Sequence, residues 1–214
     1  MWRIVCLIIG YCFGLFQTGY LYGRMHGVDI RQKGSGNSGA TNTLRVLGIK
    51  AGLIVFLGDM LKTLIPCLAV RLIFGNTEPE AAYIYMMYTG IGVVLGHNYP
   101  FYLNFKGGKG IAATAGLVIA MDWKVVAIGL PAFIIVVAVS RFVSLGSIVV
   151  VTVVWICMLV FGQLGYYSLT PAGKIEFYLL GLFWMLLAIW RHRANIKRLI
   201  AGTENKLSFH KKEE

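Results

Sequence analysis

Charged residues are scarce in this sequence, and their scarcity excludes an ordinary soluble globular domain. Asp, Glu, Lys and Arg make up 14% of the chain and apolar residues 57%, where soluble domains have about 25% and about 45–50%. A bilayer-spanning helix needs about 20 residues, so the length accommodates roughly seven such helices and no separate soluble domain. The sequence therefore predicts one integral membrane domain over residues 1–214.

Acidic residues are the scarcest charged group, with nine Asp and Glu against twenty Lys and Arg. In a soluble protein, a net charge of +11 would suggest binding to nucleic acid. In a chain this apolar, it indicates loops that face an anionic leaflet or anionic substrates, and we expect no nucleic-acid partner.

Metal-binding and disulfide patterns are also missing. The histidines are scattered, and no CxxC pair occurs among Cys6, Cys12, Cys67 and Cys157, which all lie in apolar runs. We therefore expect four small core residues, no metal and no cofactor. No small-residue cleavage site follows the first apolar run, so we also expect that run to be a retained helix.

Long apolar runs are what the sequence does contain. They occupy residues 4–22, 51–74, 81–96, 111–121, 125–139, 145–167 and 175–190. The fourth and fifth are short, so this pair either crosses the bilayer twice or forms a re-entrant hairpin that turns at residues 122–124. The predicted fold is an all-α polytopic bundle of about seven transmembrane helices, the fourth and fifth short.

The loop cations are distributed unevenly between the two sides of this bundle. Fifteen of the twenty Lys and Arg fall in the C-terminal tail and the loops on its side. The opposite side holds Arg3, Arg71, Lys124 and Lys174. By the positive-inside rule, the C-terminus and its loops are cytoplasmic and the N-terminus is outside.

Two glycine-rich segments fall on that cytoplasmic side. Residues 34–42 read GSGNSGATN and are followed by Arg45, so backbone amides, hydroxyls and a guanidinium fork are available to an anion. Neither nucleotide-binding glycine motif matches, and a flexible linker is the alternative interpretation. Residues 96–110 read GHNYPFYLNFKGGKG, which places lysines and free glycine amides at a helix N-terminus, where a phosphate binds well.

The C-terminal tail adds a donor-rich stripe. His192, Asn195 and Arg198 follow one another at steps of three, so they share one helical face. We interpret Arg191 and Lys211 as topology determinants only, together with the neighbouring Arg193 and Lys212.

Two shorter polar features remain in the sequence. Residues 141–147 read RFVSLGS, a weak signal alone. Asp59 and Lys62 stand one turn apart inside the second apolar run. Charged side chains are energetically expensive in a membrane, so this pair has either a structural role as an ion pair or a role in the substrate site.

The four polar segments, in this order, resemble those of the bacterial membrane glycerol-3-phosphate acyltransferases that use acyl phosphate as donor. The stretch GDMLK at residues 58–62 matches a further signature of that family. The resemblance implies an inner-membrane enzyme that acylates the 1-hydroxyl of sn-glycerol 3-phosphate. The products are lysophosphatidate and inorganic phosphate, in the first step of phospholipid synthesis. Acyl-chain preference and oligomeric state are not determined by the sequence.

The site residues are carried over from this resemblance, apart from Arg141, which the cationic character of its segment adds. Ser35, His192 and Asn195 are the expected catalytic residues. The expected substrate-binding residues are Ser35, Asn37, Thr41, Asn42, Arg45, His97, Lys106, Lys109, Arg141, Ser144, Arg198 and Glu204. We expect residues 107–110 to hold one phosphate and residues 34–42 to help hold the other.

No conventional general base is visible, because no Asp stands five positions after any His. The proton acceptor is then a substrate phosphate, His192 or His97. A permease for a phosphorylated small molecule, such as glycerol phosphate, is the competing function, although no repeat relates the two halves of the chain. A purely structural membrane subunit would leave the polar segments unexplained.

Overall fold

The protein is described by a computed structural model that covers residues 1–207. Within these residues it forms ten α-helices, two short 3₁₀ helices and no β-strand. The α-helices are α1 Trp2–Gly14, α2 Thr18–Met25, α3 Ala40–Leu47, α4 Ile49–Thr77, α5 Pro79–Asn98, α6 Ile111–Met121, α7 Trp123–Ser140, α8 Val143–Gln163, α9 Pro171–Arg191 and α10 Arg193–Ile200. The 3₁₀ helices are Ile30–Gln32 and Phe101–Leu103. Lys211 and Lys212, interpreted above as topology determinants, lie outside the described residues.

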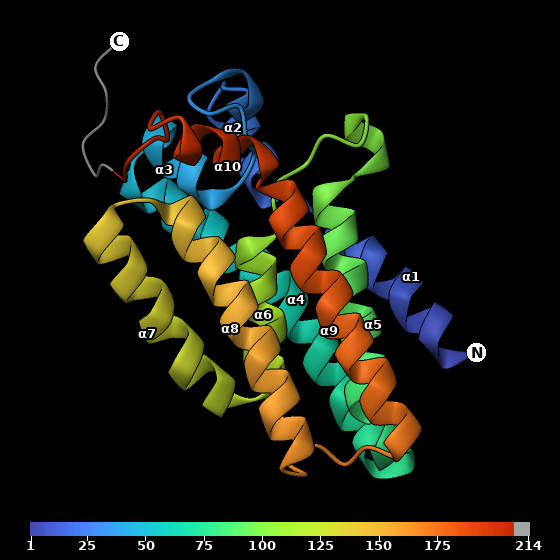
Figure 1. Cartoon of the computed structure of the whole chain (residues 1–214). Helices are drawn as coiled ribbons and strands as arrows, with labels where there is room; N and C mark the ends of the chain where they lie inside the picture. Colours follow the sequence, from blue (N-terminus) through green and yellow to red (C-terminus); the bar gives the residue numbers. More distant parts are fainter. Residues whose placement is uncertain (208–214) are drawn as a thin grey trace.

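The long helices form an upright bundle, as Figure 1 shows. Among the described residues, five segments are long and apolar enough to cross a bilayer: Trp2–Met25, Ile49–Thr77, Trp123–Ser140, Val143–Gln163 and Pro171–Arg191. Helix α5 is almost entirely buried between α1, α4, α6 and α9. Each predicted apolar run is mostly helical, so the predicted all-α membrane bundle is confirmed.

The first apolar run departs from the prediction of one helix. It breaks between Gly14 and Thr18 into α1 and α2. Two polar side chains satisfy the backbone at the break: Gln17, within the break, donates from Nε2 to Gly14 O, and Lys62 of α4 donates from Nζ to Phe16 O. Apolar composition predicted helix along the whole run but contained no signal for the tertiary bond from Lys62.

The fourth and fifth apolar runs, which are the short pair, do not form a closed hairpin. Asp122 caps α7 by accepting a bond from the amide of Lys124, so the chain turns there as predicted. Helix α6 then packs mainly on α4 and α7 mainly on α8, and the two lie apart in Figure 1. Helix α6 is short because the chain before it folds back along α5, where the amides of Gly107 and Gly108 donate to Asn98 O and His97 O.

Small residues allow α1 to approach α5 closely. A Cβ atom at Gly92 would meet the carbonyl of Leu7, and one at Gly96 would meet that of Tyr11. Three of the four cysteines are buried, but Cys12 is exposed on α1. The prediction of four core cysteines is therefore wrong for Cys12, because an apolar run does not reveal which of its faces packs against other helices.

The polar segments gather at one end of the bundle. Helices α2, α3 and α10 lie there together, while the α4–α5, α6–α7 and α8–α9 connections lie at the other end (Figure 1). At that other end, Arg3 forms an ion pair with Glu176 of α9, with 2.6 Å between Nε and Oε1. The two predicted sets of loops thus occupy opposite ends of the molecule.

Candidate active site

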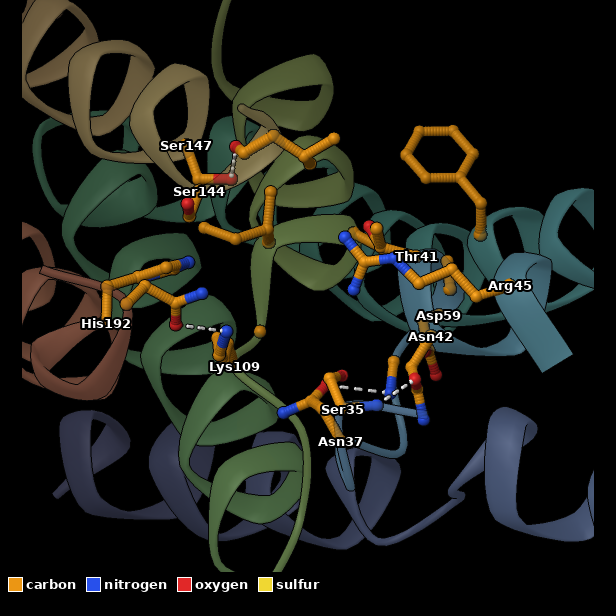
Figure 2. Close-up of a pocket in the computed structure, with 18 of the residues that line it drawn as sticks. Ser35, Asn37, Thr41, Asn42, Arg45, Asp59, Lys109, Ser144, Ser147 and His192 are labelled. Carbon is orange, nitrogen blue, oxygen red and sulfur yellow. Dashed lines mark hydrogen bonds between the residues drawn. The ribbon is translucent and has the colours of Figure 1, made fainter. Parts of the chain in front are cut away.

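A cavity of about 230 Å³ opens among the polar segments. Its walls come from the loop before α3, from helices α3 to α8, from the α5–α6 loop and from the segment that contains α10. Figure 2 shows Lys109 between His192, to its left in the view, and Ser35 and Asn37, to its right. Residues from across the sequence therefore meet in one pocket.

Twelve of the predicted site residues line this pocket. They are Ser35, Asn37, Thr41, Asn42, Arg45, His97, Lys109, Ser144, His192, Asn195, Arg198 and Glu204. The other two lie outside its lining. Lys106 is exposed on the loop before the glycines, and Arg141 is exposed at the end of α7, where its carbonyl accepts a bond from the amide of Leu207.

The loop before α3 is held in its fold by Asn42, in the first turn of α3. Asn42 Oδ1 accepts the amide of Ser35 at 2.7 Å, and Asn42 Nδ2 donates to Ile30 O at 3.0 Å. Gly34 has a φ of 59° and lies against the Asn42 side chain, so a residue with a Cβ would be both strained and obstructed there. Asn42 is therefore tied into the loop, which leaves Ser35, Thr41 and Arg45 to offer polar groups to the pocket.

The α5–α6 loop supplies the opposite wall. The amides of Gly107 and Gly108 are bonded to α5 and are not free, contrary to the expectation that they face a phosphate. The pocket is lined instead by Gly110, Ile111 and Ala112, at the first turn of α6. Unbonded amides and the helix dipole favour an anion at such a position.

Arg191 has a role that the sequence did not indicate. Its guanidinium donates to Gly107 O at 3.1 Å and to Gly108 O at 2.7 Å, and it stacks on Tyr99. It therefore fastens the glycine loop to the end of α9, which is more than the topology role assigned to it above. The pocket-lining residues Phe56, Phe133 and Ser147 were also missed as site residues, because apolar or lone hydroxyl residues in a membrane helix give no pattern of their own.

A chain of hydrogen bonds connects the tail to the other walls. Lys109 donates to Asn195, whose Nδ2 donates to Glu204 Oε1 at 2.7 Å. Glu204 also accepts bonds from Ser144 at 3.1 Å and from Arg198 at 2.8 Å. Because Arg45, Lys109 and Arg198 outnumber Glu204, the pocket carries excess positive charge and suits an anion.

Burial alters the protonation of two pocket residues outside the membrane-spanning helices. Burial, together with the nearby arginines, lowers the pKa of Lys109 to about 8. Burial also lowers the pKa of His192 to about 4, although its hydrogen bond to Ala188 O acts in the opposite direction. His192 is thus a neutral imidazole at pH 7, and because Nδ1 donates to Ala188 O at 2.8 Å, Nε2 is left as an acceptor.

The predicted pair of intramembrane charges is formed. Lys62 Nζ lies 2.8 Å from Asp59 Oδ1, and Asp59 lines the pocket. Nowhere in residues 1–207 do three His, Cys, Asp or Glu side chains gather as a metal-binding group.

Known proteins similar in sequence and structure share this fold and this length. The sequence model of the glycerol-3-phosphate acyltransferase family matches residues 4–202. The chain belongs to this family. It is an acyltransferase, so the competing interpretation as a permease is wrong.

Individual relatives match over nearly the whole chain. Glycerol-3-phosphate acyltransferases of Clostridioides difficile (strain 630) and Thermoanaerobacter sp. (strain X514) are 41% and 39% identical to it. Each alignment covers 97% of this chain, and 97% and 96% of the respective relative.

Solved structures agree with this assignment. The crystal structure of the integral membrane glycerol 3-phosphate acyltransferase PlsY in its glycerol 3-phosphate form is 33% identical, with a TM-score of 0.83 over 96% of each chain. The lysophosphatidic acid form of PlsY gives a TM-score of 0.81 at 32% identity, over 97% of this chain and 96% of that one.

The lowered pKa of Lys109 predicts how acyltransferase activity depends on pH. Only the ammonium form of Lys109 attracts a phosphate, so kcat/KM should fall as pH rises through about 8. The substrate phosphate, with a second pKa of about 6, is already fully charged in that range. Lys109→Arg should lower activity but abolish this alkaline decline, because arginine stays charged. Steady-state rates between pH 6.5 and pH 9.5 make the comparison (about three units around the lysine pKa). An alkaline decline that persists unchanged in Lys109→Arg would assign it to another group.

Proposed function

We propose that the protein transfers an acyl group from acyl phosphate to the 1-hydroxyl of sn-glycerol 3-phosphate, giving lysophosphatidate and inorganic phosphate. The observation that carries the proposal is one pocket with cations on separate walls, Arg45 on α3 and Lys109 before α6. Two phosphorylated substrates need two such positions. The glycerol 3-phosphate and lysophosphatidic acid forms of PlsY support this acceptor and this product.

The two walls suggest how the substrates divide the pocket. Lys109 and the first turn of α6 hold one phosphate, and Arg45 with the hydroxyls of Ser35 and Thr41 holds the other. Both walls are joined to the tail, since Asn195 accepts from Lys109 and donates to Glu204, and Arg45 donates to Asn205 O. With both substrates held, the acceptor hydroxyl is aligned with the acyl carbon.

The chemical step is an acyl transfer that needs little further activation. The hydroxyl oxygen attacks the acyl carbon, the bond from that carbon to the phosphate oxygen breaks, and phosphate leaves with the hydroxyl proton. Acyl phosphate is a mixed anhydride with a good leaving group. Alignment of two bound reactants can supply about 7–11 kcal/mol of the barrier, and fixed cations stabilise the charge that develops on phosphate.

The pocket environment of His192 favours a substrate phosphate over this histidine as the proton acceptor. His192 presents an unprotonated Nε2, but its pKa of about 4 makes it a weak base. A phosphate with a second pKa of about 6 binds a proton about 100-fold more tightly. The substrate phosphate therefore takes the proton, and His192 Nε2 orients the hydroxyl by accepting its hydrogen bond.

The membrane placement follows from charge. The end that carries α2, α3 and α10 also carries most of the loop cations, so it faces the cytoplasm and the N-terminus faces the outside. The protein then lies in the bacterial inner membrane with its pocket open to cytoplasmic glycerol 3-phosphate.

The donor and the absence of a metal requirement are tested together. Purified protein in a chelator should form lysophosphatidate and phosphate from acyl phosphate and glycerol 3-phosphate, and should not accept acyl-CoA. A thioester offers no phosphate to the cationic walls, and lysines and arginines neutralise the charge that magnesium neutralises in other phosphate sites. Equal turnover with acyl-CoA, or activity that returns only when a divalent ion is added, would contradict the proposed mechanism.

The orientation is tested by labelling from one side. In a cysteine-free variant, single cysteines at Asn76 and Ser168 should react with an impermeant thiol reagent added outside spheroplasts, whereas cysteines at Ser38 and Asn104 should not. Ser38 is buried in the folded protein, so its reactivity is also measured after permeabilisation and denaturation. Labelling of Asn104 from outside would reverse the proposed orientation.

A further inference from the structure

Lys62 meets three close acceptors deep in the bundle, beside the pocket, and Gly14 O lies farther away, at 3.5 Å from its Nζ. Its Nζ lies 2.8 Å from Asp59 Oδ1, 2.6 Å from Phe16 O and 2.9 Å from His97 Nδ1. The side chains of Asp59, Lys62 and His97 are all buried. One side chain therefore connects the break between α1 and α2 to a histidine of the pocket wall.

The geometry decides which ring nitrogen of His97 carries the proton. Lys62 is an ammonium, because a neutral amine would leave the buried carboxylate of Asp59 without a cation. An ammonium has three N–H donors and no acceptor. It donates to all three neighbours, so His97 Nδ1 accepts and the ring proton is on Nε2.

The protonated edge of His97 lies at the glycine wall of the pocket. A Cβ at Gly108 would collide with His97 Nε2, so only glycine lets the ring approach this closely. The backbone of His97 is held as well, since its carbonyl accepts from Gln17 Nε2 at 3.1 Å and from the amide of Gly108 at 3.2 Å. His97 and Lys109 line the same pocket.

We propose that Lys62 and Asp59 are positioning residues that fix His97 as a neutral imidazole with its proton on Nε2, and that this ring supports the glycine loop which presents Lys109 to a substrate phosphate. His97 is thus a positioning residue and not a base. His192 has the opposite tautomer, with the proton on Nδ1 and an acceptor at Nε2. The substrate part of this proposal rests on the proposed function, whereas the tautomer of His97 does not.

The tautomer is measured directly by ¹⁵N NMR of the full-length protein, labelled at histidine, in detergent micelles at pH 7. The His97→Asn spectrum identifies the His97 signals by their loss. The expected result is a protonated Nε2 and an unprotonated Nδ1 in the wild type. A proton on Nδ1, or on both nitrogens, would overturn the proposal without any assay of activity.

The positioning role is measured in Lys62→Met, which keeps the length of the side chain and removes its donors. Asp59 Oδ1 lies 3.7 Å from His97 Nδ1, so the carboxylate should then draw the ring proton to Nδ1. We expect this reversal together with a fall of about 10- to 100-fold in kcat/KM, because a displaced glycine loop weakens the bond from Lys109 to the charged phosphate.

Lys50→Met is the matched control, because Lys50 lies exposed on the same helix. It should leave both the spectrum and the kinetics unchanged. Unchanged His97 signals in a folded Lys62→Met protein would overturn the positioning role. If Lys62→Met does not fold, the wild-type spectrum still decides the tautomer. Failure of acyl transfer from acyl phosphate, with the predicted tautomer observed, would count against the proposed function alone.

Discussion

Unwound backbone at the depth of the bundle must find hydrogen-bond partners, and the site depends on how this protein supplies them. Lipid offers none, and irregular backbone persists at such depth only where protein or water satisfies it. Gln17 and Lys62 bond the carbonyls exposed by the break between α1 and α2. The loop before α6 is held through its amides by the end of α5 and through its carbonyls by Arg191.

These tethers fix the backbone segments that carry the cations of the pocket. Lys109 follows two glycines that are fixed at both their amides and their carbonyls, so its backbone position does not depend on a bound phosphate. Arg198 and Asn195 are held by Glu204, which also reaches Ser144 on α8. A site organised before binding loses less free energy when the substrates are ordered.

The sequence predicted the architecture because continuity of apolar residues and the distribution of loop cations are strong signals in membrane proteins. Most of the pocket residues came from the resemblance to the family, and the clustering of glycine, lysine and asparagine on one side of the membrane pointed to the same segments. It could not predict the break after Gly14, because that break is held by tertiary bonds from Gln17 to the end of α5 and from Lys62 to Phe16 O. Arg191 was missed for a related reason, since a basic residue after a span satisfies the topology rule whether or not it also binds a loop.

Charge provides the remaining link between structure and function. The buried pair of Asp59 and Lys62 is neutral as a unit, so the net field in the pocket comes from Arg45, Lys109 and Arg198 against Glu204. That excess of cations is what makes the cavity suitable for phosphorylated substrates.

The central claim, that Lys109 holds a substrate phosphate, is tested most directly by the kinetics of Lys109→Ala with each substrate varied in turn. A charge-assisted bond to phosphate contributes about 1.5–3 kcal/mol, so kcat/KM should fall about 10- to 100-fold for at least one substrate. Lys197→Ala, an exposed lysine on α10 outside the pocket lining, should leave both values unchanged. Wild-type kcat/KM for both substrates in a correctly inserted Lys109→Ala protein would contradict the account.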